Sequence, residues 1–175
     1  MPRETVHTDI LGHETTVSYS SRWAGYALVA IRLAIGWVLF DAGVTYVFTP
    51  GNSVATELLA VPPSNPFGGI FAFLGQFAGW LVDPLFGWGL AVSGASLIFG
   101  AALRTSAGVG IVLSTLQWAS ALPLDGGFLV DHHLVYAFVL FGLAVFGAGR
   151  IVGLDAYFEA HRLVRDRPWL RYLLG

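Results

Sequence analysis

Residues 23–49 form one long apolar segment, and this segment constrains the fold more than any other feature of the chain. A bilayer core about 30 Å thick needs about 20 helical residues at about 1.5 Å each, so the segment can cross it with some tilt. Only two charged side chains, Arg32 and Asp41, interrupt the segment. It therefore predicts a transmembrane helix.

The composition also indicates a membrane protein. The chain has 175 residues, of which 55% are hydrophobic and 11% charged, whereas a soluble domain carries about 25% charged residues. The chain has no cysteine, which excludes a thiolate nucleophile and cysteine-held zinc or iron–sulfur clusters. All nine cationic residues are arginines, so a Schiff-base lysine is excluded as well.

Further apolar stretches at 84–103, 105–122 and 132–152 are long enough to cross a bilayer, as is 24–48 within the first segment. Backbone polar groups must be satisfied within lipid, so each spanning segment is expected to be a helix. The stretch 67–82 is apolar but short, and four glycines weaken it as a helix. It can form either a fifth span or a helix that lies along the membrane surface.

The distribution of arginine favours the surface helix. With four spans, every arginine outside the first span falls on one side of the membrane, and the opposite loops, 50–83 and 123–131, contain none. Positive residues accumulate in cytoplasmic loops. The sequence therefore predicts an all-α, polytopic protein of the cell membrane. It would be a four-transmembrane-helix bundle with both termini cytoplasmic and an extra interfacial helix in the first outer loop.

Two tails flank the predicted membrane domain, which covers 23–153. Residues 1–22 are rich in Thr, Ser and charged residues, and they predict a polar cytoplasmic tail. Residues 154–175 predict an amphipathic, basic cytoplasmic tail. Its arginines alternate with apolar residues, which suits contact with anionic lipid and not with nucleic acid: Arg162, Arg165, Arg167 and Arg171.

Polar and titratable side chains gather in the outer half of the predicted bundle. Asp41 is nine residues from Arg32, so the two lie on opposite faces of their helix and are not expected to pair. An acid inside a span marks a candidate functional site. The candidate proton acceptors are Asp41, His132 and His133, and the candidate ligand-binding residues are Asp83, Gln117, Trp118 and Asp131.

A structural explanation competes with the functional one at each of these positions. Asp83 precedes Pro84 and can cap a helix, Asp131 can cap the last span, and Gln117 can bond a neighbouring helix. His132 and His133 are adjacent, so on a helix they point about 100° apart. Because they lack the i, i+4 spacing of a helical metal pair, no metal or haem site is expected, and no nucleotide-binding fingerprint is present. Arg32 is expected to reach toward the cytoplasmic surface.

Two short motifs resemble the DoxX family of membrane proteins. Arg32-Leu-Ala-Ile-Gly-Trp-Val-Leu-Phe followed by Gly43 is similar to the first-helix signature of the family. Asp131-His-His-Leu-Val-Tyr-Ala-Phe, with Gly147-Ala-Gly-Arg and Leu154-Asp155, is similar to its last-helix signature. The chain departs from the family pattern at Asp41, where an uncharged residue is expected.

The resemblance implies a four-helix membrane bundle and a link to membrane redox systems. Some members serve as the DoxD subunit of thiosulfate:quinone oxidoreductase. The leading hypothesis is accordingly a small quinone-linked subunit whose outer half binds the quinone headgroup. Its expected partners are the lipid bilayer and either other redox subunits or a second copy of itself. Two alternatives remain open: a non-enzymatic assembly subunit of a larger membrane complex, and a pathway for a small solute or protons.

Overall fold

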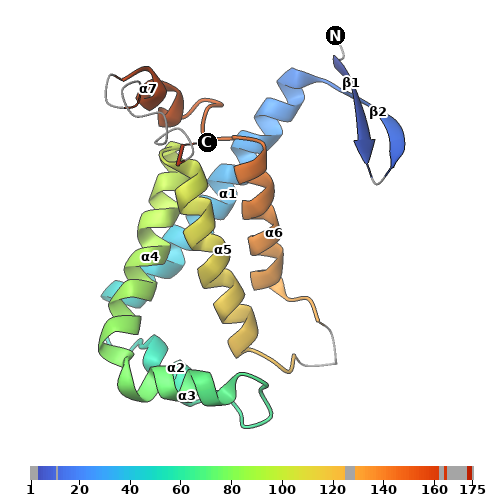
Figure 1. Ribbon diagram of the computed structural model, residues 1–175. Helices are drawn as coiled ribbons and strands as arrows, with labels where there is room; N and C mark the ends of the chain where they lie inside the picture. The colour runs from blue at the N-terminus through green and yellow to red at the C-terminus, as the bar shows by residue number, and fades with distance from the viewer. Residues whose placement is uncertain (1–3, 11, 125–128, 162–163, 165–172, 175) are drawn as a thin grey trace.

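Helices make up most of the computed structural model, which describes residues 4–10, 12–124, 129–161, 164 and 173–174. Four longer helices run alongside one another (Figure 1): α1 Ser21–Phe48, α4 Gly79–Phe99, α5 Leu103–Ser120 and α6 His132–Val145. Two short helices, α2 Val54–Leu59 and α3 Gly68–Phe77, lie across one end of this bundle. Both chain termini and α7, Leu154–Ala160, lie toward the other end.

The prediction of a mainly helical chain is confirmed, and two helices, α1 and α4, are long and apolar enough to cross a membrane. Helix α5 has 18 residues, and the apolar helix α6 has 14. The apolar stretch predicted to continue to residue 152 leaves the helical conformation after Val145. Turns and bends follow it, with Gly147 and Val152 at positive φ.

Helix α4 begins five residues before the predicted start at 84, so Asp83 does not cap it, which was the structural alternative considered for this residue. Pro84 lies inside the helix. It lacks an N–H, but near a helix start this removes only one hydrogen bond of the ladder. The carboxylate of Asp83 instead accepts hydrogen bonds from the start of α2.

Helices α1 and α4 approach so closely that their backbones touch. A Cβ added to Gly43 would lie 2.2 Å from the amide nitrogen of Ala91, and one added to Gly94 would lie 2.3 Å from that of Phe40. Only glycine fits at such positions, as at other helix crossings where small residues let two backbones approach closely. Above and below this crossing, fully buried leucines fill the bundle: Leu39, Leu90, Leu97, Leu103, Leu140 and Leu143.

The N-terminal segment corrects the all-α prediction, because it is not an irregular polar tail. Strands β1, Glu4–Ile10, and β2, His13–Tyr19, form an antiparallel hairpin in which Glu4 pairs with Tyr19. Gly12 adopts a φ of 81° at the turn, and its N–H donates to Oδ1 of Asp9 at 2.8 Å. The β-branched residues of both strands and the Asp-x-x-Gly turn were the sequence signals for this hairpin.

Candidate functional site

A cavity of about 150 Å³ lies where α2 and α3 cover the ends of α4 and α5. Most of its lining is aliphatic or aromatic: Val54, Leu58, Phe71, Leu74, Val82, Leu85, Phe86, Leu113 and Leu116. Three polar residues complete it: Glu57 on α2, and Gln117 and Ser120 on α5. The cavity is therefore an apolar chamber with a few polar groups, which is the usual chemistry of a small-molecule site.

Gln117 is the predicted site residue that reaches this cavity. Its side-chain amide makes no hydrogen bond to any residue that the structure describes, so its donors and acceptor are available to a ligand. The hydroxyl of Ser120 instead donates to the backbone carbonyl of Gln117 at 2.8 Å. The carboxylate of Glu57 accepts hydrogen bonds from the hydroxyl of Tyr46 at 2.9 and 3.1 Å, and these bonds fix the orientation of the Glu57 side chain at the cavity.

Asp83 holds α2 in place over the cavity. Its carboxylate accepts from the hydroxyl of Ser53 at 2.9 Å and from the backbone N–H of Ala55 at 2.8 Å. Ser53 is the N-cap of α2 and accepts in turn from the N–H of Thr56 at 3.2 Å. Asp83 thus satisfies the start of a helix other than its own, and it positions the cavity wall.

Asn65 holds the other end of the same cover, and sequence reasoning missed it. Its side chain is 5% exposed, and its amide nitrogen donates to the carbonyls of Ala119, Ser120 and Leu122 at 2.8, 3.1 and 2.7 Å. Its side-chain oxygen accepts from the N–H of Phe67 at 2.7 Å. One loop amide therefore fastens the segment before α3 to the end of α5. An Asn placed between prolines in a loop was the only signal.

Trp118 lies beside Gln117 in sequence but does not line the cavity. Its indole Nε1 donates to the backbone carbonyl of Leu129 at 2.8 Å. This bond fastens the end of α5 to the connection that precedes α6. Trp118 therefore has a structural partner, and no ligand is needed to explain its position.

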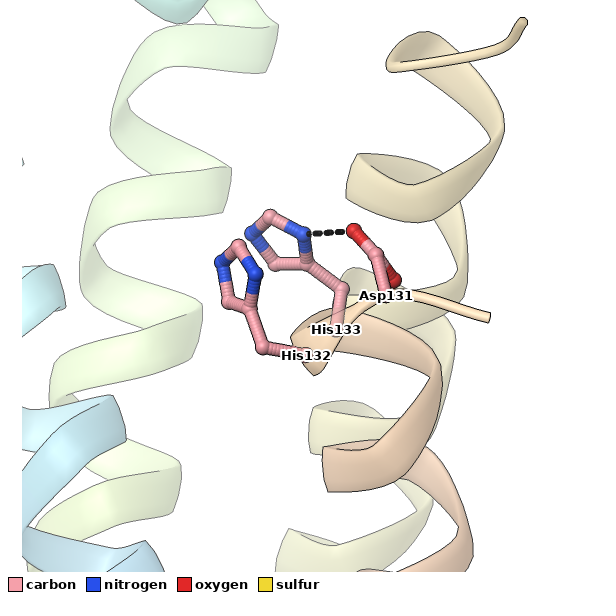
Figure 2. Close-up of side chains that lie close together, drawn as sticks. All are labelled: Asp131, His132 and His133. Carbon is pink, nitrogen blue, oxygen red and sulfur yellow. Dashed lines mark hydrogen bonds and ion pairs between the residues drawn. The ribbon is translucent and has the colours of Figure 1, made fainter. Parts of the chain in front are cut away.

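Asp131, His132 and His133 form a second group at the start of α6. Asp131 caps the helix by accepting from the N–H of Leu134 at 3.0 Å, and its other oxygen lies 2.7 Å from Nδ1 of His133 (Figure 2). The two imidazole rings lie together, with centroids 3.9 Å apart, so the prediction that they point apart was wrong. In the first turn of a helix, side-chain rotation outweighs the 100° spacing of the backbone.

The pKa of Asp131 is lowered from its ordinary value. Burial acts in the opposite direction, because it disfavours the charged carboxylate. The hydrogen bond from Leu134 and the contact with His133 outweigh that effect. The carboxylate is therefore ionised at neutral pH.

Asp41 stands apart from all of these residues. Its side chain is exposed on α1, it has no hydrogen-bond partner among the described residues, and it does not line the cavity. It lies on the opposite face from buried Arg32, as expected, and unlike Gln117 it does not line the cavity.

Arg32 does not reach the surface, contrary to expectation. Its side chain is 2% exposed, and its guanidinium donates to the carbonyls of Ala148, Ile151 and Val152 at 2.6, 3.0 and 3.1 Å. Buried Asp155 accepts from the N–H groups of Ala102 and Leu103 at 2.6 and 3.0 Å. The two motifs quoted above therefore meet at the end of the bundle away from the cavity. The four arginines of the predicted basic tail lie outside the described residues.

The chain was compared with protein-family models, with curated proteins and with solved structures, and it matches none of them.

Proposed function

We propose that this protein is a DoxX-type membrane protein with four spans, which binds the ring of a lipid quinone in the cavity between α2, α3, α4 and α5. In this proposal it serves a membrane redox system as a quinone-linked subunit. The ring-sized apolar cavity with the unbonded Gln117 amide is the observation that carries the proposal.

The outer surface supports a membrane location. In the most apolar 18-residue stretches of α1 and α4, only 28% and 39% of residues are buried, unlike the core helices of a soluble protein. Large apolar side chains face outward from all four long helices, among them Trp37, Val92, Val112 and Phe138, which are 61%, 59%, 58% and 65% exposed. Apolar patches of this extent mark contact with lipid or another protein.

The arrangement of the helices supports four spans. Both termini lie toward one end of the bundle, whereas α2, α3 and the α5–α6 connection lie toward the other (Figure 1). This is the arrangement expected from the absence of arginine in residues 50–83 and 123–131. Helix α3 would then lie along the outer membrane surface, and the cavity would open at the depth of the lipid headgroups.

The size and lining of the cavity fit one ring of a quinone. An engineered protein cavity of about 150 Å³ binds benzene, so a cavity of about this volume accommodates a single six-membered ring. The aliphatic and aromatic lining suits the faces of the ring. The Gln117 amide can donate to a ring carbonyl, and the isoprenoid chain would leave between the helices into lipid.

A bound quinone would supply the redox chemistry, since its ring accepts two electrons and two protons on reduction. The residues of this chain bind and orient the ring and keep water from its faces. Glu57, held by the Tyr46 hydroxyl at the polar side of the cavity, is the group placed to exchange protons with water. This assignment moves the proton-handling role from Asp41 to Glu57.

Equilibrium binding of a short-chain benzoquinone to the purified protein in detergent tests the proposal. Gln117→Leu removes one hydrogen bond at nearly constant volume, so its Kd should rise about 3- to 10-fold. Leu74→Phe adds a ring to the cavity and should abolish binding. Gln76→Leu is the matched control, because Gln76 is exposed on α3 outside the cavity. Equal Kd values for the variants at 117, 74 and 76 would overturn the proposal. Quinone reduction in membranes, with thiosulfate as the first donor, then tests activity.

The exposure of Asp41 favours a second candidate function, that of an assembly subunit. A carboxylate on the outer face of an apolar helix is costly in lipid unless a partner supplies a cation or hydrogen bonds. A membrane subunit docked on this face of α1 would satisfy it. Co-purification from native membranes should then yield a stable partner with the wild-type chain and lose it with Asp41→Leu.

A further inference from the structure

The group at the start of α6 has the composition of a metal site. Asp131, His132 and His133 each offer one ligand atom, and these three atoms lie within 4.8 Å of one another. They come from three consecutive residues, and the α6 helix fixes the backbone of the two histidines. His132 is exposed and the other two are partly buried, so the group is open to water on one side. None of the three lines the cavity proposed for quinone.

The orientation of His133 is set by a carboxylate. Its Nδ1 lies 2.7 Å from Oδ2 of Asp131, and its other ring nitrogen points to the side where His132 lies (Figure 2). In metal sites a ligating histidine almost always bonds a carboxylate or carbonyl through its second nitrogen, which fixes the ring and strengthens it as a ligand. Asp131 is itself held by the N–H of Leu134, so it is a rigid partner.

We propose that His132 and His133 bind one divalent transition-metal cation of the zinc class, and that Asp131 orients His133 for this purpose. The two ring centroids are 3.9 Å apart. A cation bound to a nitrogen of each ring at the usual metal–nitrogen distance of about 2.0–2.1 Å would require rotation about the side-chain bonds of exposed His132. Imidazole nitrogen is a preferred ligand of zinc, copper and nickel.

Two protein ligands leave coordination positions for water or a small ligand. A zinc site that keeps open positions is characteristic of chemistry and not of a purely structural role. The N-terminal end of the helix dipole disfavours a nearby cation, and the adjacent carboxylate offsets this effect. Tyr136, one turn along α6, has its ring centroid 5.7 and 6.3 Å from those of His132 and His133 and closes one side of the group.

Calorimetric titration of Zn²⁺ into the metal-free, full-length protein in detergent tests the proposal. The wild type should bind one Zn²⁺ per chain at micromolar concentration. His132→Ala and His133→Ala should each abolish this binding, and Asp131→Asn, which retains a good helix cap, should weaken it about 10- to 100-fold. The matched control is the double variant His7→Ala, His13→Ala in the N-terminal hairpin, which should bind Zn²⁺ as the wild type does.

A thermal measurement keeps the test valid if a variant folds poorly. Zn²⁺ should raise the Tm of the wild type and the hairpin control, because a ligand that binds only the folded state stabilises it. It should leave the Tm of His132→Ala and His133→Ala unchanged. No stoichiometric binding by the wild type, or equal binding by the histidine variants, would overturn the proposal. Neither result depends on quinone binding, which is measured separately.

Discussion

The guanidinium of Arg32 donates a 2.6 Å hydrogen bond to the backbone carbonyl of Ala148, a residue 116 positions later in the chain. The same guanidinium bonds the carbonyls of Ile151 and Val152, just where the chain leaves α6 and turns back. Carbonyls at and beyond a helix end lack partners within the helix. One side chain of the first helix therefore fastens the irregular segment that follows α6.

Replacement of Arg32 should be strongly destabilising. Arg32→Met leaves the buried carbonyl of Ala148 and the partly buried carbonyls of Ile151 and Val152 without this donor, and it removes a favourable charge interaction with buried Asp155, so the free energy of unfolding should fall by about 3–5 kcal/mol. The free energy of unfolding of Arg32→Lys should lie between those of the wild type and Arg32→Met. The lysine keeps the positive charge, but its ammonium cannot reproduce the geometry of the guanidinium fork. Thermal and denaturant unfolding in detergent measure both effects. Arg150→Gln is the control, since Arg150 is half exposed and pairs with Glu159, and it should cost no more than about 1 kcal/mol. A similar loss in Arg32→Met and Arg150→Gln would contradict this account.

The crossing of α1 and α4 should tolerate no added methyl group. Gly43→Ala and Gly94→Ala force the two backbones apart, and each should destabilise the protein by about 2–3 kcal/mol or more. Gly108→Ala and Gly142→Ala are matched helical controls, because an added Cβ there meets nothing within 4 Å. The controls should stabilise the protein by about 0.5–1 kcal/mol. The idea of backbone contact is wrong if all four variants behave alike.

The four-span topology can be tested by labelling, because the chain has no cysteine and any introduced thiol is unique. Ser64→Cys and Val130→Cys should react with a membrane-impermeant maleimide from outside the cell, and Tyr157→Cys only after the membrane is opened. Ser64 and Val130 belong to the two loops without arginine, and Tyr157 to exposed α7. Reaction of both Val130→Cys and Tyr157→Cys from outside intact cells would mean that α6 does not cross the membrane, and it would reject four spans.

Asp41 should be dispensable for the isolated protein. Because its exposed side chain makes no hydrogen bond to a described residue and does not line the cavity, Asp41→Leu should change the free energy of unfolding by no more than about 0.5 kcal/mol and leave quinone binding unchanged. Unfolding in detergent and the benzoquinone titration measure these two quantities. A loss of quinone binding in Asp41→Leu would restore Asp41 as part of the ligand site and argue against Glu57.

The sequence locates the long apolar helices because hydropathy is a local property, but it does not predict α2, and it misplaces the start of α4 and the end of α6. The long apolar segment contains α1 almost to its ends, and the run of prolines after Pro62 separates the bundle from α3. Gln117 was named from the sequence as a candidate ligand-binding residue, and it lines the cavity. Asp131 was also weighed as a helix cap, and the structure shows that bond.

The remaining errors concern partners that lie far apart in sequence or rotations about side-chain bonds. Asp83 bonds the start of α2 at Ala55, which lies 28 residues earlier in the chain. Arg32 bonds the carbonyl of Ala148, which lies 116 residues later. Local spacing in the sequence therefore reveals neither role. The meeting of His132 and His133 depends on side-chain rotamers, which a helical projection leaves out. The cavity itself requires Asn65 to fasten a loop against α5, and nothing in the apolar pattern indicates this bond.

The sequence separation between Arg32 and its acceptors bears on how the protein is made. A ribosome completes α1 long before Ala148 exists, and α1 can meet α4 through Gly43 and Gly94 in the meantime. During that interval the guanidinium has none of its final acceptors. An interrupted or truncated chain that ends before residue 148 therefore keeps a cation in its first helix without the acceptors that Ala148, Ile151 and Val152 supply.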